Sequence, residues 1–514
     1  MKQIIIFRLQ TIYLIGLFFL ITGCDKFFDV NEDTDLPSAA TPNLLLSPIQ
    51  GLMATNCYEQ GETAAYFAQQ IATISGFNSV KDRWDYTSVT RVGLFRRHFH
   101  DVASNARNLY LTAGEEGSKN YEGAGHTMMV LSTQTATDLF GQMPYREALK
   151  GNPSPAYDEQ SIIYEGMLEE IDLAISLFRA SSETDRNMKD GSDLIFNGNI
   201  QQWEAFAHGI KARILLHLTP NINQDYQLVI DEVNLALASW EDAVYNYNEG
   251  EVNAYLLNQW GPARARPEWD YTINTLGQSA PTPFLLESVM GYDPETGQVN
   301  DPRLSVMMTP DTFDMDGIKE VRYLSIAPSE GKDDLKDDEE YPNLYDSYMT
   351  SDFSVQPYMV EEELHFIKAE AAFRSGQLSE AFQSFQNGVE RHMVRVEIAQ
   401  PDISTFMASG MVPNTAADLT LSHIMMQKWL AMYLQLEAWV DMRRYQYDSQ
   451  IYKGLKRPEN LAFFWDENET GQWIQRMPYD NQTEEIFNKP ELDRLGAFQN
   501  PDWLKVPLWW ANSN

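Results

Sequence analysis

The chain is poor in positive charge. Its 514 residues include 38 Lys and Arg against 74 Asp and Glu, which gives a net charge of −36. A nucleic-acid-binding surface needs clustered cations to neutralise phosphates, so this balance argues against a nucleic-acid partner. The charge fits instead a solvated acidic surface, or a neutral ligand held by aromatic side chains.

Recognisable catalytic motifs are also missing. The sequence contains no H-E-x-x-H, no G-x-S-x-G and no Gly-rich phosphate loop. Ser329–Lys332 matches S-x-x-K without companion motifs, and His208 and His217 do not have the spacing of a metal pair on one helix face. We therefore expect a protein that is not an enzyme, with no metal and no cofactor. The abundance of carboxylates leaves a glycosidase pair open as an alternative.

Cysteine and long apolar runs are both scarce. The run Ile12–Ile21 is too short for a transmembrane helix, but it follows two basic residues and precedes Ile-Thr-Gly-Cys ending at Cys24. This order is typical of an export signal, and its end resembles a bacterial lipobox, which predicts removal of residues 1–23 and lipidation of Cys24. Only Cys57 would then remain, so no internal disulfide could form. A plain signal peptide with an incidental cysteine is the alternative.

Amphipathic helices dominate the rest of the chain, and Glu361–Arg391 contains a pair of them. Apolar residues recur at i, i+4, i+7 and i+11 from Val360, and Ser375-Gly376 interrupts this pattern. A second stripe begins at Leu378, with Ser379 as the expected N-cap. Two such helices form an antiparallel pair close to the tetratricopeptide pattern, and other pairs should stack on it to bury its remaining face. An ordinary helical hairpin is the alternative.

The same period recurs elsewhere and predicts an all-α fold. We expect a tetratricopeptide-like superhelix of helix pairs over about 121–239 and 358–445, within one domain spanning 44–514 and preceded by a polar tether at 24–43. The further expected helices are Leu44–Thr73, Leu94–Leu111, Tyr121–Phe140, Ser161–Phe178, Gln201–Leu218, Tyr226–Ser239 and Leu421–Tyr445.

Two long stretches lack this period. Residues 240–357 are rich in Gly, Pro, Asn and Asp, and residues 458–514 are similarly irregular. Because 240–357 is too long for an ordinary connection, we expect an irregular subdomain that carries function.

Two loop segments combine aromatic and polar residues in a way that suits a sugar. An aromatic plane covers the apolar face of a sugar ring, while amide, carboxylate or guanidinium groups bind its hydroxyls. The alternative for each tryptophan is burial in the core beneath a long loop. The first segment offers Trp84 and Tyr86 for stacking, with Asn78, Arg83 and Asp85 at the rim; the second offers Trp260, Trp269 and Tyr271, with Asn258, Gln259 and Arg264.

Several motifs in a fixed order resemble those of a known family. They are Thr137–Tyr145, Trp203–Leu218, the Glu361–Arg391 hairpin, Ile424–Tyr445, Arg476–Tyr479, Asn488 and Lys505–Pro507, after the lipobox and its polar tether. Together they resemble the SusD/RagB family of Bacteroidetes outer-membrane lipoproteins, more particularly its SusD-like branch, over essentially the whole mature chain. One departure is Asp480, where many members have proline.

The resemblance implies a surface-exposed nutrient-binding protein, anchored in the outer membrane by lipid on Cys24. It would act as a lid on a SusC-like TonB-dependent barrel, with the helix pairs facing the barrel and the irregular subdomain holding the nutrient. A glycan is the expected nutrient, and an oligopeptide or another metabolite bound by the same architecture is the second reading. An exported hydrolase is the third. The family motifs transfer no ligand residue to this sequence.

Overall fold

The computed structural model describes residues 40–74, 81–86, 93–219, 221–222, 225–247, 257–265, 275–315, 318–331, 341–345, 347–465 and 471–512. Residues 1–41 and 42–514 separate into two units, and all the helices and strands described below belong to the second. The predicted export signal and Cys24 lie outside the described residues, as does nearly all of the predicted tether.

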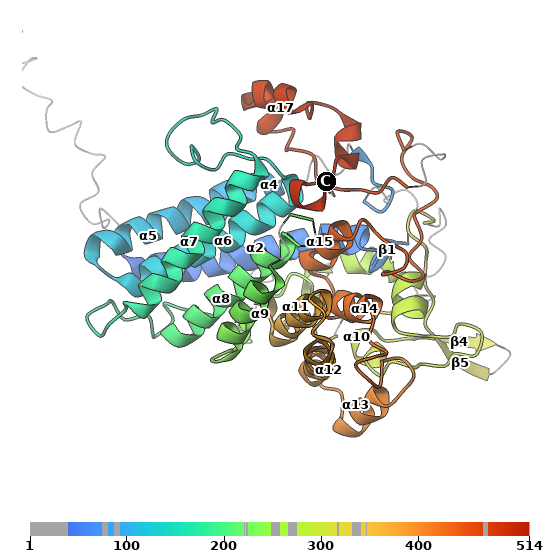
Figure 1. The fold of residues 1–514 in the computed structure, drawn as a ribbon. Coiled ribbons are helices and arrows are strands. Elements are labelled where there is room, and N and C mark those ends of the chain that lie inside the picture. The colour runs from blue at the N-terminus through green and yellow to red at the C-terminus, as the bar shows by residue number, and fades with distance from the viewer. Residues whose placement is uncertain are drawn as a thin grey trace, which may run out of the picture. The chain divides into compact units, whose positions relative to one another are not determined.

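The expected all-α architecture is confirmed. Each long helix packs against the next in an array that turns through the molecule (Figure 1). Its members are α5 (Ser104–Glu116), α6 (Lys119–Phe140), α7 (Gln160–Arg179), α8 (Ile200–His217), α9 (Tyr226–Leu237), α11 (Glu361–Arg374) and α12 (Leu378–Arg395).

Local chemistry explains where some of these helices begin. The Asn199 side chain accepts hydrogen bonds from the N–H groups of Gln201 and Gln202 and so caps α8. The expected cap at Ser379 is wrong, because α12 begins one residue earlier, after Gln377, which makes no side-chain cap bond. Gly376, with φ of +79°, makes the turn that precedes it.

Three predicted helices differ from those observed. The first, α2, covers Pro42–Phe67 and is followed by strand β1 (Ile71–Thr73), so it ends before the expected Thr73. The second predicted helix, Leu94–Leu111, is observed as three parts: α4 (Leu94–Arg97), a π-helical turn at His98–Ala103, and α5. It extends beyond the predicted end to Glu116.

The third predicted helix, Leu421–Tyr445, is broken into α14 (Leu421–Ala431) and α15 (Leu436–Arg444), with φ of +59° at Leu434. The side chain of Gln70 holds this break, because its Oε1 accepts from the Leu434 N–H at 2.8 Å and its Nε2 donates to the Met432 carbonyl at 3.2 Å.

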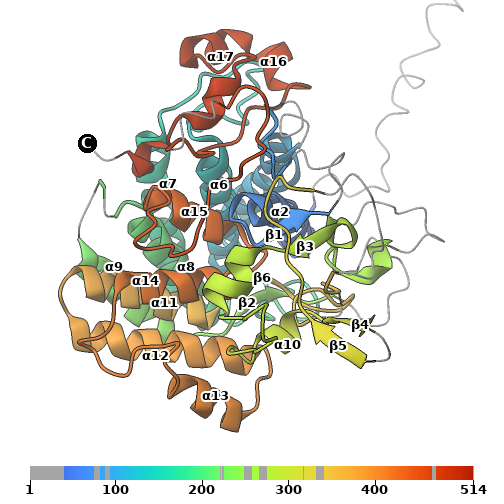
Figure 2. The ribbon, with the colours of Figure 1, turned by 90° about the vertical axis from the view of Figure 1, so that its right-hand side faces the viewer.

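The region between α9 and α11 is irregular, as expected. Strand β2 (Ala243–Tyr245) pairs antiparallel with β6 (Gln356–Met359) and closes the region at its two ends (Figure 2). Two further antiparallel pairs are β1 with β3 (Ser279–Pro281), and β4 (Asp311–Met315) with β5 (Ile318–Arg322). In the described part of this region, α10 (Leu304–Met307) is the one α-helix. Beyond α12 come α13 (Gln400–Met407), α16 (Glu484–Phe487) and α17 (Lys489–Leu495).

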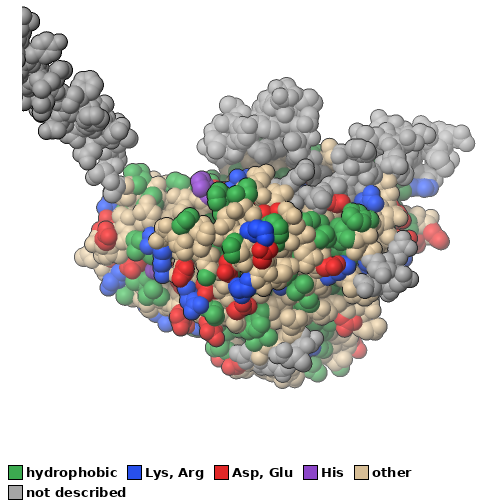
Figure 3. Space-filling model, turned by 90° about the horizontal axis from the view of Figure 1, so that it is seen from above, with side chains coloured by type: hydrophobic (Ala, Val, Ile, Leu, Met, Phe, Trp, Pro, Cys, Tyr) green, Lys and Arg blue, Asp and Glu red, His purple; other side chains and the backbone are tan. Residues whose placement is uncertain are grey.

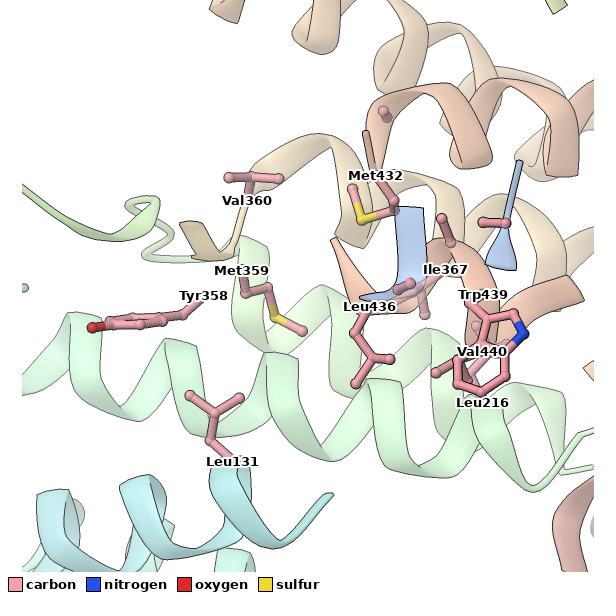
Figure 4. Close-up of a cluster of buried hydrophobic side chains, with 14 of the residues drawn as sticks. Leu131, Leu216, Tyr358, Met359, Val360, Ile367, Met432, Leu436, Trp439 and Val440 are labelled. Carbon is pink, nitrogen blue, oxygen red and sulfur yellow. The ribbon is translucent and has the colours of Figure 1, made fainter. Parts of the chain in front are cut away.

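The core lies where the helix array meets α15 and β6. Leu131 of α6, Leu216 of α8 and Ile367 of α11 converge there with Leu436 and Trp439 of α15 (Figure 4). Burial of large apolar side chains from elements so distant in the chain ties the two halves of the array together.

Gly388 allows α12 to approach α11 closely. A Cβ atom at this position would lie 3.0 Å from the ring of Phe366 on α11. We therefore expect Gly388→Leu to lower the free energy of unfolding by about 1–3 kcal/mol through overpacking. Chemical denaturation checks this, with Gly410→Leu as the control because no atom lies within 4 Å of a Cβ there. Equal losses in both variants would contradict the tight helix pair.

Candidate functional site

The structure divides the first predicted segment into a buried and an accessible part. Trp84 is 0% exposed, and its ring lies 5.0 Å from that of Trp465 and 5.8 Å from that of Trp473. The Trp465 indole N–H also donates to the Trp84 carbonyl at 3.2 Å. The prediction that Trp84 stacks on a ligand is therefore wrong for this structure, because both its faces are enclosed by protein.

The neighbours of Trp84 remain accessible. Arg83 is exposed, and its Nε donates to the Asn460 carbonyl at 2.9 Å. Tyr86 is half-buried; burial, with a smaller contribution from the charge of Glu485, raises the pKa of its hydroxyl to about 12. Asn78, the remaining committed residue of this segment, lies outside the described residues.

A phenylalanine that the sequence reading missed lies on the segment packed against Trp84. The Phe463 side chain is 96% exposed, while its neighbour Phe464 is half-buried and Trp465 is buried. The Ala462 N–H donates to the Arg83 carbonyl at 3.0 Å, which joins residues 81–86 to residues 457–465. We call the accessible residues Arg83, Tyr86 and Phe463 the aromatic rim. The available signal was the run Phe463–Trp465 in an irregular segment.

The described half of the second predicted segment is structural. Trp260 is 0% exposed, with its ring 4.7 Å from that of Tyr58 on α2, so its predicted stacking on a ligand is also wrong. Asn258 Nδ2 donates to the carbonyls of Met349 and Ser351 at 2.9 and 2.8 Å, which fixes this loop to the end of the irregular region.

The other predicted residues of the second segment are less fully described. Arg264 lies in a short 3₁₀ turn, Pro262–Ala265, and its side chain is outside the described residues. Trp269 and Tyr271 also lie outside them. Of the predicted ligand tryptophans, the structure describes Trp84 and Trp260. They pack in different parts of the core, Trp84 against Trp465 and Trp260 against Tyr58.

A hollow of about 600 Å³ lies in the irregular region beside the end of α12. Arg395 lies 5.5 Å above the ring of Tyr348 and forms an ion pair with the buried Glu362. The guanidinium is neutralised in this way, and Glu397 adds a carboxylate to the lining of the hollow. Its lining is dominated by hydroxyl groups: Ser305, Thr309, Tyr345, Ser347, Tyr348, Ser351 and Ser354.

One cluster of titratable side chains has the composition of an acid–base site. His217 places Nδ1 3.2 Å from Asp138 and Nε2 2.8 Å from Glu437. Burial opposes protonation of His217, but the two carboxylates raise its pKa to about 9. Because the His217 side chain is fully buried, no substrate reaches it in this structure, and we assign the cluster a structural role.

Among the described residues, no group of three or more His, Cys, Asp and Glu side chains could hold a metal ion. Nor does this part of the chain contain a helix that is long and apolar enough to cross a membrane.

The comparisons with known proteins agree with this architecture of stacked helices and an irregular insertion. The chain belongs to the SusD-like family: the family model described as "Starch-binding associating with outer membrane" matches residues 34–479. This confirms the resemblance drawn from the motifs. Membership assigns the chain to a class of nutrient-binding proteins that associate with the outer membrane and are binding proteins rather than enzymes. No curated protein matches the chain significantly.

Solved structures share the fold. A chitin-binding protein is 18% identical with a TM-score of 0.70, and the match covers 92% of this chain and 100% of that one. A SusD/RagB family protein from Bacteroides thetaiotaomicron is 19% identical with a TM-score of 0.65, over 93% and 100% of the two chains. A SusD homologue from Bacteroides vulgatus is 17% identical with a TM-score of 0.69, over 92% and 98%.

Proposed function

We propose that this protein captures a glycan at the cell surface and delivers it to a SusC-like TonB-dependent barrel in the outer membrane. Family membership and the predicted export signal ending at Cys24 support this role. Lipid on Cys24 would hold the protein at the membrane, and the helix array would face the barrel.

The aromatic rim is the surface at which we place the glycan. The observation that carries this assignment is the 96% exposure of Phe463, since an apolar ring held in water above a packed aromatic layer is suited to the C–H face of a sugar. Arg83 and Tyr86 supply polar groups on the adjoining segment. Asn78, Arg264, Trp269 and Tyr271 remain proposed ligand contacts on the two loops.

Loss of the exposed ring should weaken binding without unfolding the protein. A glycan and peptide array identifies the ligand, and calorimetry then compares variants. We expect Phe463→Ala and Tyr86→Ala each to weaken glycan binding about three- to tenfold, the effect of losing one aromatic contact. Leu235→Ala, which removes an exposed apolar side chain from α9, serves as the control.

Two results would overturn the assignment. Unchanged glycan affinity in both rim variants would exclude the aromatic rim as the binding surface. Selective binding of peptides on the array would replace the glycan as the ligand class while leaving the family role intact.

A further inference from the structure

A second hollow, of about 630 Å³, lies beside α16. Its walls are the helical stretch from Leu94 to Glu116, the loop around 144–155 and residues of α16 and its end. Glu485 of α16 affects the hydroxyl of Tyr86 in the rim, whereas the neighbouring Glu484 lines the hollow. Figure 2 shows α16 and α17 together at the top of the molecule. The volume is within the range of small-ligand sites, about 300–1,000 Å³.

A single helical stretch gives this hollow its positive charge. Arg96 and Arg107 line it, and His100 between them is hydrogen-bonded through Nδ1 to Asp101 at 2.8 Å. Within the described part of the chain, Arg96 and Arg107 make no ion pair and no hydrogen bond. Arg97, which is not in the lining, is instead paired with both Glu59 and Asp101.

Unpaired arginines are unusual in so acidic a chain. Most of its described arginines contact carboxylates, including Arg146, Arg179, Arg186 and Arg494 on the surface. The face seen in Figure 3 carries hydrophobic side chains among both basic and acidic ones. The two arginines at this hollow are therefore available to an anionic ligand.

The rest of the lining suits a sugar ring. Phe95 and Phe99, with ring centres 5.1 Å apart, form an apolar wall opposite Pro144 and Leu149. Asn488 is buried, and its Oδ1 has no hydrogen-bond partner, so this atom can accept from a ligand hydroxyl.

The one carboxylate of the lining is occupied by protein. Glu484 accepts hydrogen bonds from the Tyr157 hydroxyl and from Asn488 Nδ2, the latter at 2.6 Å. Burial raises the pKa of Glu484, and the hydrogen bonds from Tyr157 and Asn488 oppose this shift.

We propose that this hollow binds an acidic saccharide, with Arg96 and Arg107 holding carboxylate or sulfate groups and Phe99 and Leu149 covering a ring face. The two arginines are separated by more than two helical turns, because the stretch between them combines α4, the π-helical turn and α5. This separation favours an oligosaccharide with several acidic groups over a single sugar. The proposal rests on glycan capture as the function and assigns the ligand a charge.

Calorimetry with a short oligogalacturonate, a short chondroitin sulfate oligosaccharide and a neutral maltooligosaccharide tests the proposal on purified protein. We expect Arg96→Gln with Arg107→Gln to weaken binding of the acidic oligosaccharides at least tenfold, since charge-assisted contacts to guanidinium groups are lost. Raising the ionic strength should weaken wild-type binding in the same direction. The uronate and the sulfate distinguish which acidic group is preferred.

The control double variant is Arg179→Gln with Arg391→Gln, which removes the same charge from two exposed arginines outside the lining. Equal affinity of wild type and the Arg96/Arg107 variant for acidic oligosaccharides would overturn the proposal, as would binding of the neutral oligosaccharide alone. Binding of the neutral oligosaccharide alone would leave glycan capture as the proposed function. Absence of binding to every saccharide tested would contradict both glycan capture and the acidic-saccharide proposal.

Discussion

Replacement of Trp84 by alanine should lower the free energy of unfolding by about 3–5 kcal/mol, the usual loss for a buried tryptophan. The indole is fully buried between Trp465 and Trp473, and Arg457 lies 5.9 Å from its ring centre. Its removal would open a cavity between residues 81–86 and the C-terminal segment. Because the aromatic rim rests on this layer, the loss would appear first as instability and not as a missing ligand contact.

Chemical denaturation measures this loss, and Tyr86→Ala serves as the comparison two residues away. Tyr86 is half-buried, so we expect a smaller loss of stability than for Trp84→Ala. Glycan binding by the folded fraction of Trp84→Ala, measured at low temperature, should persist. A variant that keeps its stability but no longer binds glycan would instead identify Trp84 as a ligand contact and would contradict the burial seen here.

The helix array could be predicted because its signal is local. The stripes of α7 and α12 repeat every three or four residues, and the same residues that set this period are buried against the neighbouring helix. The break between α14 and α15 could not be predicted in this way. It depends on the side chain of Gln70, which lies more than 350 positions away in the sequence.

The candidate site was predicted only in part, for the same reason. A tryptophan in a loop looks the same in the sequence whether it is exposed or covered by another segment. Trp84 is covered by Trp465, 381 positions further on, and that contact leaves Phe463 in solvent. The hollow lined by Arg96 and Arg107 likewise depends on Asn488, which no local pattern connects with them. The candidate ligand surfaces of this protein are formed by contacts between irregular segments that lie far apart in the sequence.

The buried charges pose a different problem, because enclosing a charge in the core costs stability. Lys428 lies 2.8 Å from Asp441 and 3.7 Å from Glu437, while Arg444 contacts both Glu370 and Asp441 at 2.5 Å. Charges enclosed in this way are tolerated only when each is paired. His217 completes the set by accepting a proton between Asp138 and Glu437.

This arrangement predicts a stability that falls at alkaline pH. Although burial disfavours the charged ring, the neighbouring carboxylates raise the pKa of His217 from 6.5 to about 9. Because His217 holds its proton more tightly in the folded than in the unfolded chain, protonation stabilises the fold fully below pH 6.5. This contribution to stability is lost as the pH rises through 9. The shift corresponds to about 3 kcal/mol. Burial also raises the pKa of Cys57 from 9.0 to about 12, so its thiol adds a smaller alkaline loss that begins near pH 9 and is common to wild type and His217 variants.

The free energy of unfolding, measured by denaturation at pH 6.5 and pH 9, tests this expectation. Wild type should lose about 3 kcal/mol more than His217→Gln over the interval, because the variant has no proton to release there. His100→Gln, at an 83% exposed position, should keep the wild-type slope. Parallel slopes for wild type and His217→Gln would mean that the ring is neutral in the folded protein. Asp138 and Glu437 would then be balanced by Lys428 and the arginines alone.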